Sequence, residues 1–135
     1  MKDIINKWGI ELLTLLGAFF IPITGVLLMV SAMVLLDFIT GLMKVKKLGQ
    51  KRTSSGYKRT LLKWASYMLV VLIAHGIELS MQLPVDVSAI VLTGLCYVEL
   101  KSIDENWEIV YGYSIFKRVI NLIKPTKNHE YPESK

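Results

Sequence analysis

The chain has 135 residues, a length that suits one domain and excludes two ordinary ones. It is 53% hydrophobic and 20% charged, and the charges are segregated from the apolar runs, which favours membrane helices joined by polar loops over a soluble core. The net charge of +5 raises the possibility of nucleic-acid binding, but the basic residues lie directly beside apolar runs, where anionic lipid and membrane topology explain them. We therefore expect membrane lipids, and no nucleic acid, as partners.

The N-terminal segment, residues 3–20, begins with charges and becomes wholly apolar, with apolar residues near helical spacing. It is predicted to form a hydrophobic or amphipathic helix that lies in the membrane interface or dips into the bilayer. A cleaved signal peptide is not expected, because the apolar stretch from Leu12 to Leu36 is too long and no small-residue cleavage site follows it.

Pro22 offers either a kink or a new helix start. We favour a new start, because residues 22–43 supply about the 20 residues that a membrane span needs. The alternative is one kinked helix from Ile10 to Leu36.

A basic loop over residues 44–59 follows this first span. Between Lys44 and Lys63 there are eight Lys or Arg residues and no acid, a pattern that keeps a short loop on the cytoplasmic side. The residues expected to set topology or contact lipid here are Lys44, Lys46, Lys47, Lys51, Arg52, Lys58, Arg59 and Lys63.

Two further spans are predicted at about residues 60–83 and 86–106. Pro84 ends the first of them, and Asp86 or Ser88 is expected to cap the next helix. The third span is short, and it ends in a charged extension on the cytoplasmic side.

The C-terminal part is predicted to be a basic amphipathic helix at 114–124 on the inner leaflet, followed by a polar tail at 125–135. Lys117 and Arg118 on its polar face add to the predicted topology and lipid contacts and favour a cytoplasmic C-terminus. Three spans then place the N-terminus outside. The predicted fold class is an all-α integral membrane protein with three transmembrane helices plus these two terminal helices, so that residues 1–124 form a single membrane domain.

Several polar residues interrupt the apolar runs. Asp37, with Gly41 on the same helix face, either makes a contact inside the bundle or reaches toward Lys44 or Lys63 at the cytoplasmic rim. His75, Glu78 and Gln82 form a polar stripe that could line a pore, carry protons or, as we favour, hold helices together.

Another polar cluster lies around the inner end of the third span. Glu99, Ser102 and Asn106 share a helix face, and Lys101 and Glu105 form an i,i+4 pair. An ordinary polar helix end is one interpretation. The cluster is denser than a helix end requires, so a surface for self-association is the other.

Catalysis finds little support. Neither His75 nor His129 has a plausible set of zinc ligands, the single Cys96 excludes a disulfide framework, and no nucleophile elbow or P-loop is present. We expect no enzymatic activity, no catalytic or metal site and no cofactor.

Two stretches resemble signatures of one family. Asp37-Phe-Ile-Thr-Gly41, the basic loop, Ser54-Ser-Gly56 and Lys63 at the start of an apolar helix resemble the toxin-secretion/phage-lysis holin family. The run from Glu99 to Asn106 resembles the second signature of that family, at the end of the last span. The positions that carry over are Asp37, Gly41, Ser55, Gly56, Lys63, Glu99, Ser102, Glu105 and Asn106.

The resemblance implies a phage or prophage protein of the bacterial cytoplasmic membrane that forms homo-oligomers. It would open lesions that release an endolysin or a toxin, with no direct contact to the endolysin required. The assembly or pore candidates are Asp37, Gly41, His75, Glu78, Gln82, Glu99, Ser102, Glu105 and Asn106. Two other classes stay open: a small channel or transporter subunit, and a membrane anchor that docks a cytoplasmic partner.

Overall fold

The computed structural model describes residues 2–51 and 53–123, with side chains from Lys7 onward. These residues contain no strand, so the prediction of an all-helical chain is confirmed. The helices are α1 (Lys2–Phe20), α2 (Thr24–Lys47), α3 (Ser54–Met81), α4 (Val87–Tyr111) and α5 (Ile115–Ile123). Arg52, residue 124 at the end of the expected amphipathic helix, and the expected tail at 125–135 lie outside the described residues.

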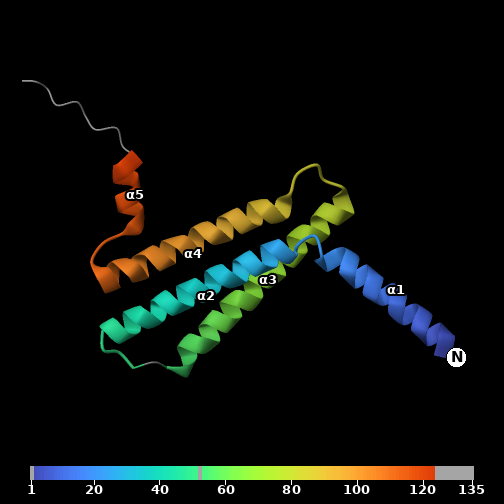
Figure 1. Cartoon of the computed structure of the whole chain (residues 1–135), viewed down its shortest axis with the longest axis horizontal. Helices are drawn as coiled ribbons and strands as arrows, with labels where there is room; N and C mark the ends of the chain where they lie inside the picture. The colour runs from blue at the N-terminus through green and yellow to red at the C-terminus, as the bar shows by residue number, and fades with distance from the viewer. Residues whose placement is uncertain (1, 52, 124–135) are drawn as a thin grey trace, which may run out of the picture.

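Three helices form a bundle. Figure 1 shows α2, α3 and α4 side by side, with α3 antiparallel to the other two. The parallel pair α2 and α4 packs most extensively, whereas α2 and α3 make the smallest contact of the three. The buried apolar core is small and consists mainly of Val30, Met33, Val34, Val71 and Ala74. Most large apolar side chains face outward, as in a bundle whose solvent is lipid.

The first helix leaves the bundle. α1 extends away from it at the end where α4 begins (Figure 1). Residues 21–23, which include Pro22, form a turn, so α1 and α2 are separate helices and not one kinked helix from Ile10 to Leu36. Phe19 contacts α3 through an edge-on approach to the His75 ring, with 5.1 Å between ring centroids.

The basic loop is shorter than the expected 44–59. α2 runs on to Lys47, and α3 begins at Ser54 and not near residue 60, so the link covers only residues 48–53. Gly49 ends α2 with a positive φ of 63°, which glycine adopts without strain, and the amide of Gln50 donates to the Val45 carbonyl at 3.1 Å. Lys44, Lys46 and Lys47 therefore lie in the last turn of α2, where cations offset the partial negative charge of the helix end.

The end of α3 differs from the prediction that His75, Glu78 and Gln82 form one polar stripe. Gln82 adopts the left-handed conformation at φ 48° and ends α3, so it does not extend the helical face of His75 and Glu78. Asp86 then caps α4 by accepting a hydrogen bond from the Ala89 amide at 2.7 Å.

By length and composition, α2 and α3 are candidate membrane spans. α4 is also long enough at 25 residues, but Glu99, Lys101, Asp104 and Glu105 crowd its second half. α5 begins after Gly112, which is left-handed at φ 81°, and it runs crosswise to the bundle at the end opposite α1 (Figure 1).

Candidate functional site: a polar network between three helices

One lysine joins two carboxylates inside the bundle. The Nζ atom of Lys63 on α3 lies 2.5 Å from Oδ2 of Asp37 on α2 and 2.7 Å from Oε2 of Glu99 on α4. Both carboxylates are mostly shielded, with side-chain exposures of 14% for Asp37 and 2% for Glu99. Of the alternatives for Asp37, the structure combines two: the side chain faces the bundle, and its cationic partner is Lys63.

Neutral side chains complete this cluster. The Tyr67 hydroxyl donates to Oε1 of Glu99 at 2.8 Å, so both oxygens of that carboxylate have partners. The side-chain amide of Asn106 donates to Oδ1 of Asp37 at 3.3 Å and to the Thr40 hydroxyl at 3.4 Å. We call Asp37, Thr40, Lys63, Tyr67, Glu99 and Asn106 the polar network.

Asn106 packs against α2 at Gly41. A Cβ atom at Gly41 would lie 3.8 Å from Nδ2 of Asn106, so the amide packs over the bare backbone of this position. Of the residues implied by the resemblance, Asp37, Gly41, Lys63, Glu99 and Asn106 thus come together from three helices. Tyr67 was not predicted as a site residue. Its position four residues after Lys63 places it on the same helix face, and this spacing could have indicated its role.

The network carries more acid than base. Lys63 is one cation between two carboxyl groups, and the other oxygens of these groups accept hydrogen bonds from Tyr67 and Asn106. Charges inside a membrane protein are costly unless they are paired or hydrated. Removing one partner of such a buried pair is strongly destabilising, because it leaves the other uncompensated. This cluster can therefore hold three helices in one register, or exchange its internal partners for water or another chain.

The other two residues of the second signature lie apart from the network. Ser102 is half-buried and lines a polar cavity beside Asn106. Glu105 is exposed and faces Lys101 at 4.0 Å, a separation at which a solvated ion pair contributes little. Ser55 and Gly56 lie in the first turn of α3, where the Ser55 and Thr53 hydroxyls are 2.8 Å apart.

A second polar cluster joins the far ends of α3 and α4. Glu78 accepts hydrogen bonds from the Ser88 amide at 2.6 Å and from the Ser88 hydroxyl at 3.0 Å. His75 is buried, and its Nδ1 atom lies 3.1 Å from the Glu78 carboxylate. Glu78 therefore joins α3 to α4, whereas the contact between His75 and Glu78 lies within α3, and Gln82 takes part in neither.

A third cluster fixes the start of α5. Asp104 accepts hydrogen bonds from the Ser114 hydroxyl at 2.6 Å, the Ile115 amide at 2.6 Å and the Phe116 amide at 3.3 Å. Ser114 in turn caps the helix by accepting from the Lys117 amide at 3.1 Å. We call Asp104 and Ser114 the α5 clamp. Neither residue was a candidate from the sequence, although a serine just before an amphipathic helix is a readable cap signal.

The basic residues gather at one end of the molecule. Lys46, Lys47, Lys51, Lys58 and Arg59 are exposed around the link between α2 and α3, and α5 starts at this same end (Figure 1). Lys63 differs from them, because it belongs to the polar network.

The two basic residues of α5 have partners within the chain. Lys117 donates to Glu108 at 2.7 Å, and this hydrogen bond raises the pKa of Lys117 above its ordinary value. Arg118 lies over the Tyr113 ring, with its guanidinium carbon 4.7 Å from the centroid.

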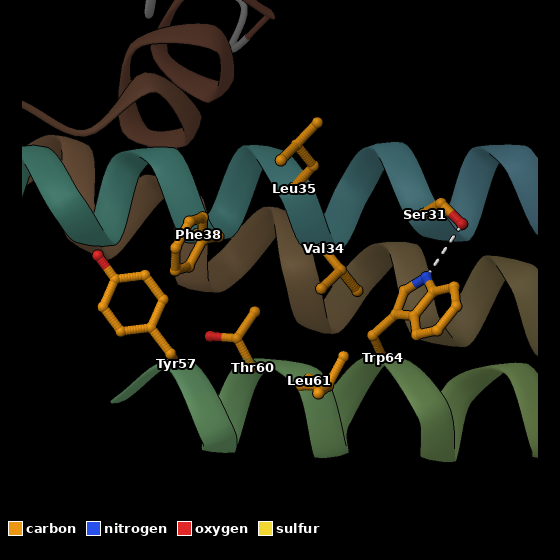
Figure 2. A pocket seen from close by; sticks show the side chains of 8 residues that line it. All are labelled: Ser31, Val34, Leu35, Phe38, Tyr57, Thr60, Leu61 and Trp64. Carbon is orange, nitrogen blue, oxygen red and sulfur yellow. Dashed lines mark hydrogen bonds between the residues drawn. The ribbon is translucent and has the colours of Figure 1, made fainter. Parts of the chain in front are cut away.

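Two hollows adjoin on the α2–α3 side. The first, of about 510 Å³, is apolar and is lined by Ser31, Val34, Leu35, Phe38, Tyr57, Thr60, Leu61 and Trp64 (Figure 2). The second, of about 460 Å³, is more polar. Its lining consists of Asp37, Phe38, Gly41, Leu42, Val45, Gln50, Lys51, Thr53, Gly56, Tyr57, Thr60, Ser102 and Asn106.

Comparison with known proteins gives one result. A family model described as the bacteriophage holin family matches residues 14–128, which is most of the chain and includes the whole polar network. No curated protein and no solved structure matches the chain.

Proposed function

The chain belongs to the bacteriophage holin family, and from this membership we propose that it oligomerises in the bacterial cytoplasmic membrane and forms lesions. These lesions release an endolysin, or a toxin, and so lead to lysis of the host cell. The family is not a family of enzymes, and the proposed role needs neither catalysis nor a cofactor. The partners are other copies of this chain and membrane lipids, while the endolysin needs no direct contact.

The proposed topology has three spans. α2 and α3 qualify by length and composition. α4 is the third, because Glu99, its most deeply placed acid, is paired with Lys63 and hydrogen-bonded by Tyr67, which lowers the cost of placing it in the membrane. The exposed basic residues at the α2–α3 link favour a cytoplasmic location for that end. The C-terminus is then also cytoplasmic, α5 lies on the inner leaflet, and the N-terminus and α1 begin outside.

The polar network is the observation that carries the proposed mechanism. Lipid provides no hydrophobic drive between helices, so small residues and polar contacts govern how they associate. In a single chain the network satisfies its members internally: Lys63 with two carboxylates, Glu99 with Tyr67, and Asn106 with Asp37. Rotating the helices to expose these groups would give each chain a polar face, which can line water when several chains assemble.

The test is inducible expression in a bacterium, with a muralytic enzyme co-expressed in the cytoplasm. We expect a delay, then abrupt loss of membrane potential and appearance of the enzyme outside the membrane. A matched culture that lacks the muralytic enzyme should depolarise at the same time without losing its wall. This pair of cultures separates lesion formation from wall hydrolysis.

Other outcomes would contradict the proposal. Ion-selective currents without enzyme release would favour a small channel or transporter subunit. High-level membrane localisation with the potential intact, together with a specific soluble partner, would favour a membrane anchor.

A further inference from the structure

The two hollows on the α2–α3 side are neighbours. Both are lined by Phe38, Tyr57 and Thr60, and the Phe38 and Tyr57 rings, with centroids 5.6 Å apart, form the wall that the two hollows share. Each hollow lies within the ~300–1,000 Å³ usual for a small-molecule site. We call the combined feature the amphipathic groove. It lies along the seam where the bundle is least tightly packed.

The apolar half runs along the bundle. Figure 2 shows Tyr57, Thr60, Leu61 and Trp64 of α3 on one side, Val34 and Phe38 of α2 on the other, and α4 behind. The Trp64 indole closes the deep end by donating to the Ser31 hydroxyl at 3.1 Å. From Tyr57 to Trp64 the helix rises about 10 Å, at ~1.5 Å per residue. This length accommodates several methylene groups of an extended chain.

The polar half lies at the basic end of the bundle. Lys51 lines it directly, and Lys58 and Arg59 follow in the first turns of α3. The Thr53 side chain makes no capping hydrogen bond to α3, and the start of this helix, whose partial positive charge favours an anion, lies next to the hollow. The acid in its lining, Asp37, is already paired with Lys63.

We propose that the amphipathic groove binds one anionic phospholipid of the cytoplasmic leaflet. An acyl chain occupies the apolar half, and the phosphate lies near Lys51 and the start of α3. The two ends of the groove match the two parts of an anionic lipid. The end near Trp64 is apolar, as an acyl chain is, and the end near Lys51 is basic, which suits a negatively charged headgroup. A helix from a second copy would cover the apolar half but leave the polar half without a partner of matching charge.

This inference rests on the residence of the chain in a membrane, and not on lesion formation, so either can fail without the other. The test uses the full chain with Trp8→Phe and Trp107→Phe, which leaves Trp64 as the only tryptophan. The protein is reconstituted in phosphatidylcholine vesicles with increasing mole fractions of phosphatidylglycerol whose acyl chains carry bromine. Protease protection of the same vesicles verifies insertion.

We expect Trp64 fluorescence to be quenched saturably by brominated phosphatidylglycerol at low mole fraction. Brominated phosphatidylcholine should quench only in proportion to its amount. Lys51→Gln should weaken the saturable component about fivefold, the effect of one basic residue worth about 1 kcal/mol at an anionic surface. Lys47→Gln is the matched control, because Lys47 is exposed at the same end but lines neither hollow.

A second pair of variants tests the apolar half. Leu61→Phe narrows the groove and should reduce saturable quenching, whereas Leu69→Phe, on an exposed part of α3 outside it, should not. Equal, unsaturable quenching by both lipids would overturn the proposal. So would loss of quenching as the protein-to-lipid ratio rises, with crosslinks forming between copies at Leu61. That outcome would identify the seam as an interface between chains.

Discussion

The Nζ atom of Lys63 lies 2.7 Å from Oε2 of Glu99, although 36 residues separate the two in sequence. Glu99 is only 1% exposed, and Lys63 also holds Asp37, so one cation serves two acids from two other helices. The three partners are not equivalent. Loss of either acid leaves one ion pair in place, whereas loss of Lys63 leaves two buried carboxylates facing each other.

The first prediction follows from this difference between losing Lys63 and losing one of the two acids. Lys63→Met should lower the free energy of unfolding by about 3 kcal/mol, the range for breaking a buried ion pair. Asp37→Asn should cost only about 1 kcal/mol, because the Lys63–Glu99 pair survives and the amide keeps hydrogen-bonding capacity. Reversible unfolding in mixed detergent micelles, followed by circular dichroism, measures both. Lys101→Met is the control, because its pair with Glu105 is exposed and 4.0 Å apart. Equal losses in all three variants would contradict the arrangement.

The second prediction concerns timing. Asp37→Leu and Glu99→Leu remove acids that each take part in two contacts of the polar network. Membrane insertion should stay intact, because an apolar residue enters the bilayer more easily than an acid. The time of lysis, or the oligomers formed before it, should change. Induced cultures followed by turbidity, together with crosslinking of membranes, test this. If both variants kept the wild-type time of lysis and the wild-type oligomers, the proposed role of the polar network in assembly would be contradicted.

Much of this arrangement was readable from the sequence. For Asp37 the sequence left two interpretations, a contact inside the bundle or a reach toward Lys44 or Lys63, and the structure shows Lys63 as its partner. The shared face of Glu99 and Asn106 followed from helical periodicity. The sequence could not give the rotation of α3 about its own axis, which decides that Lys63 turns inward while Lys58 and Arg59 stay outside.

The helix ends were harder to predict. Charge density indicated a loop over 44–59, but lysine is a good helix former and suits a helix C-terminus, so α2 extends to Lys47. Asp104 was missed for a different reason. It lies among other polar residues at the end of α4, and its role depends on a reversal of the chain at Gly112 that returns Ser114 to it.

The third prediction concerns the α5 clamp. Asp104→Ala leaves the Ser114 hydroxyl and the Ile115 amide without their acceptor. Local opening should become easier by about 1–3 kcal/mol, the usual cost of unsatisfied donors. Hydrogen exchange at Ile115 and Phe116 should accelerate about ten- to a hundredfold, because ~1.4 kcal/mol corresponds to a factor of ten. Glu108→Gln is the matched control: it weakens the contact to Lys117 but leaves the clamp intact. The same acceleration in both variants would contradict a role specific to Asp104.

The last prediction concerns the space at Gly41. Gly41 lies in the interior of α2, where glycine is about 1 kcal/mol less favourable than alanine. A Cβ atom would meet Nδ2 of Asn106 at 3.8 Å, an ordinary contact, and Gly41→Ala should therefore keep or slightly raise the melting temperature. Gly41→Leu places further atoms where the amide lies and should separate Asn106 from Asp37 and Thr40.

Displacing this amide should cost about 1–3 kcal/mol, because it leaves shielded polar groups without partners. Thermal unfolding in micelles measures the loss for Gly41→Leu. Gly94→Leu is the matched control, because Gly94 lies in α4 with no atom within 4 Å of the added Cβ, so this variant should be stable. If the two leucine variants melt alike, a small residue at position 41 is not what lets Asn106 reach α2. If only Gly41→Leu is destabilised, and Asn106→Ala removes the difference between Gly41→Ala and Gly41→Leu, the glycine and the amide act as one unit.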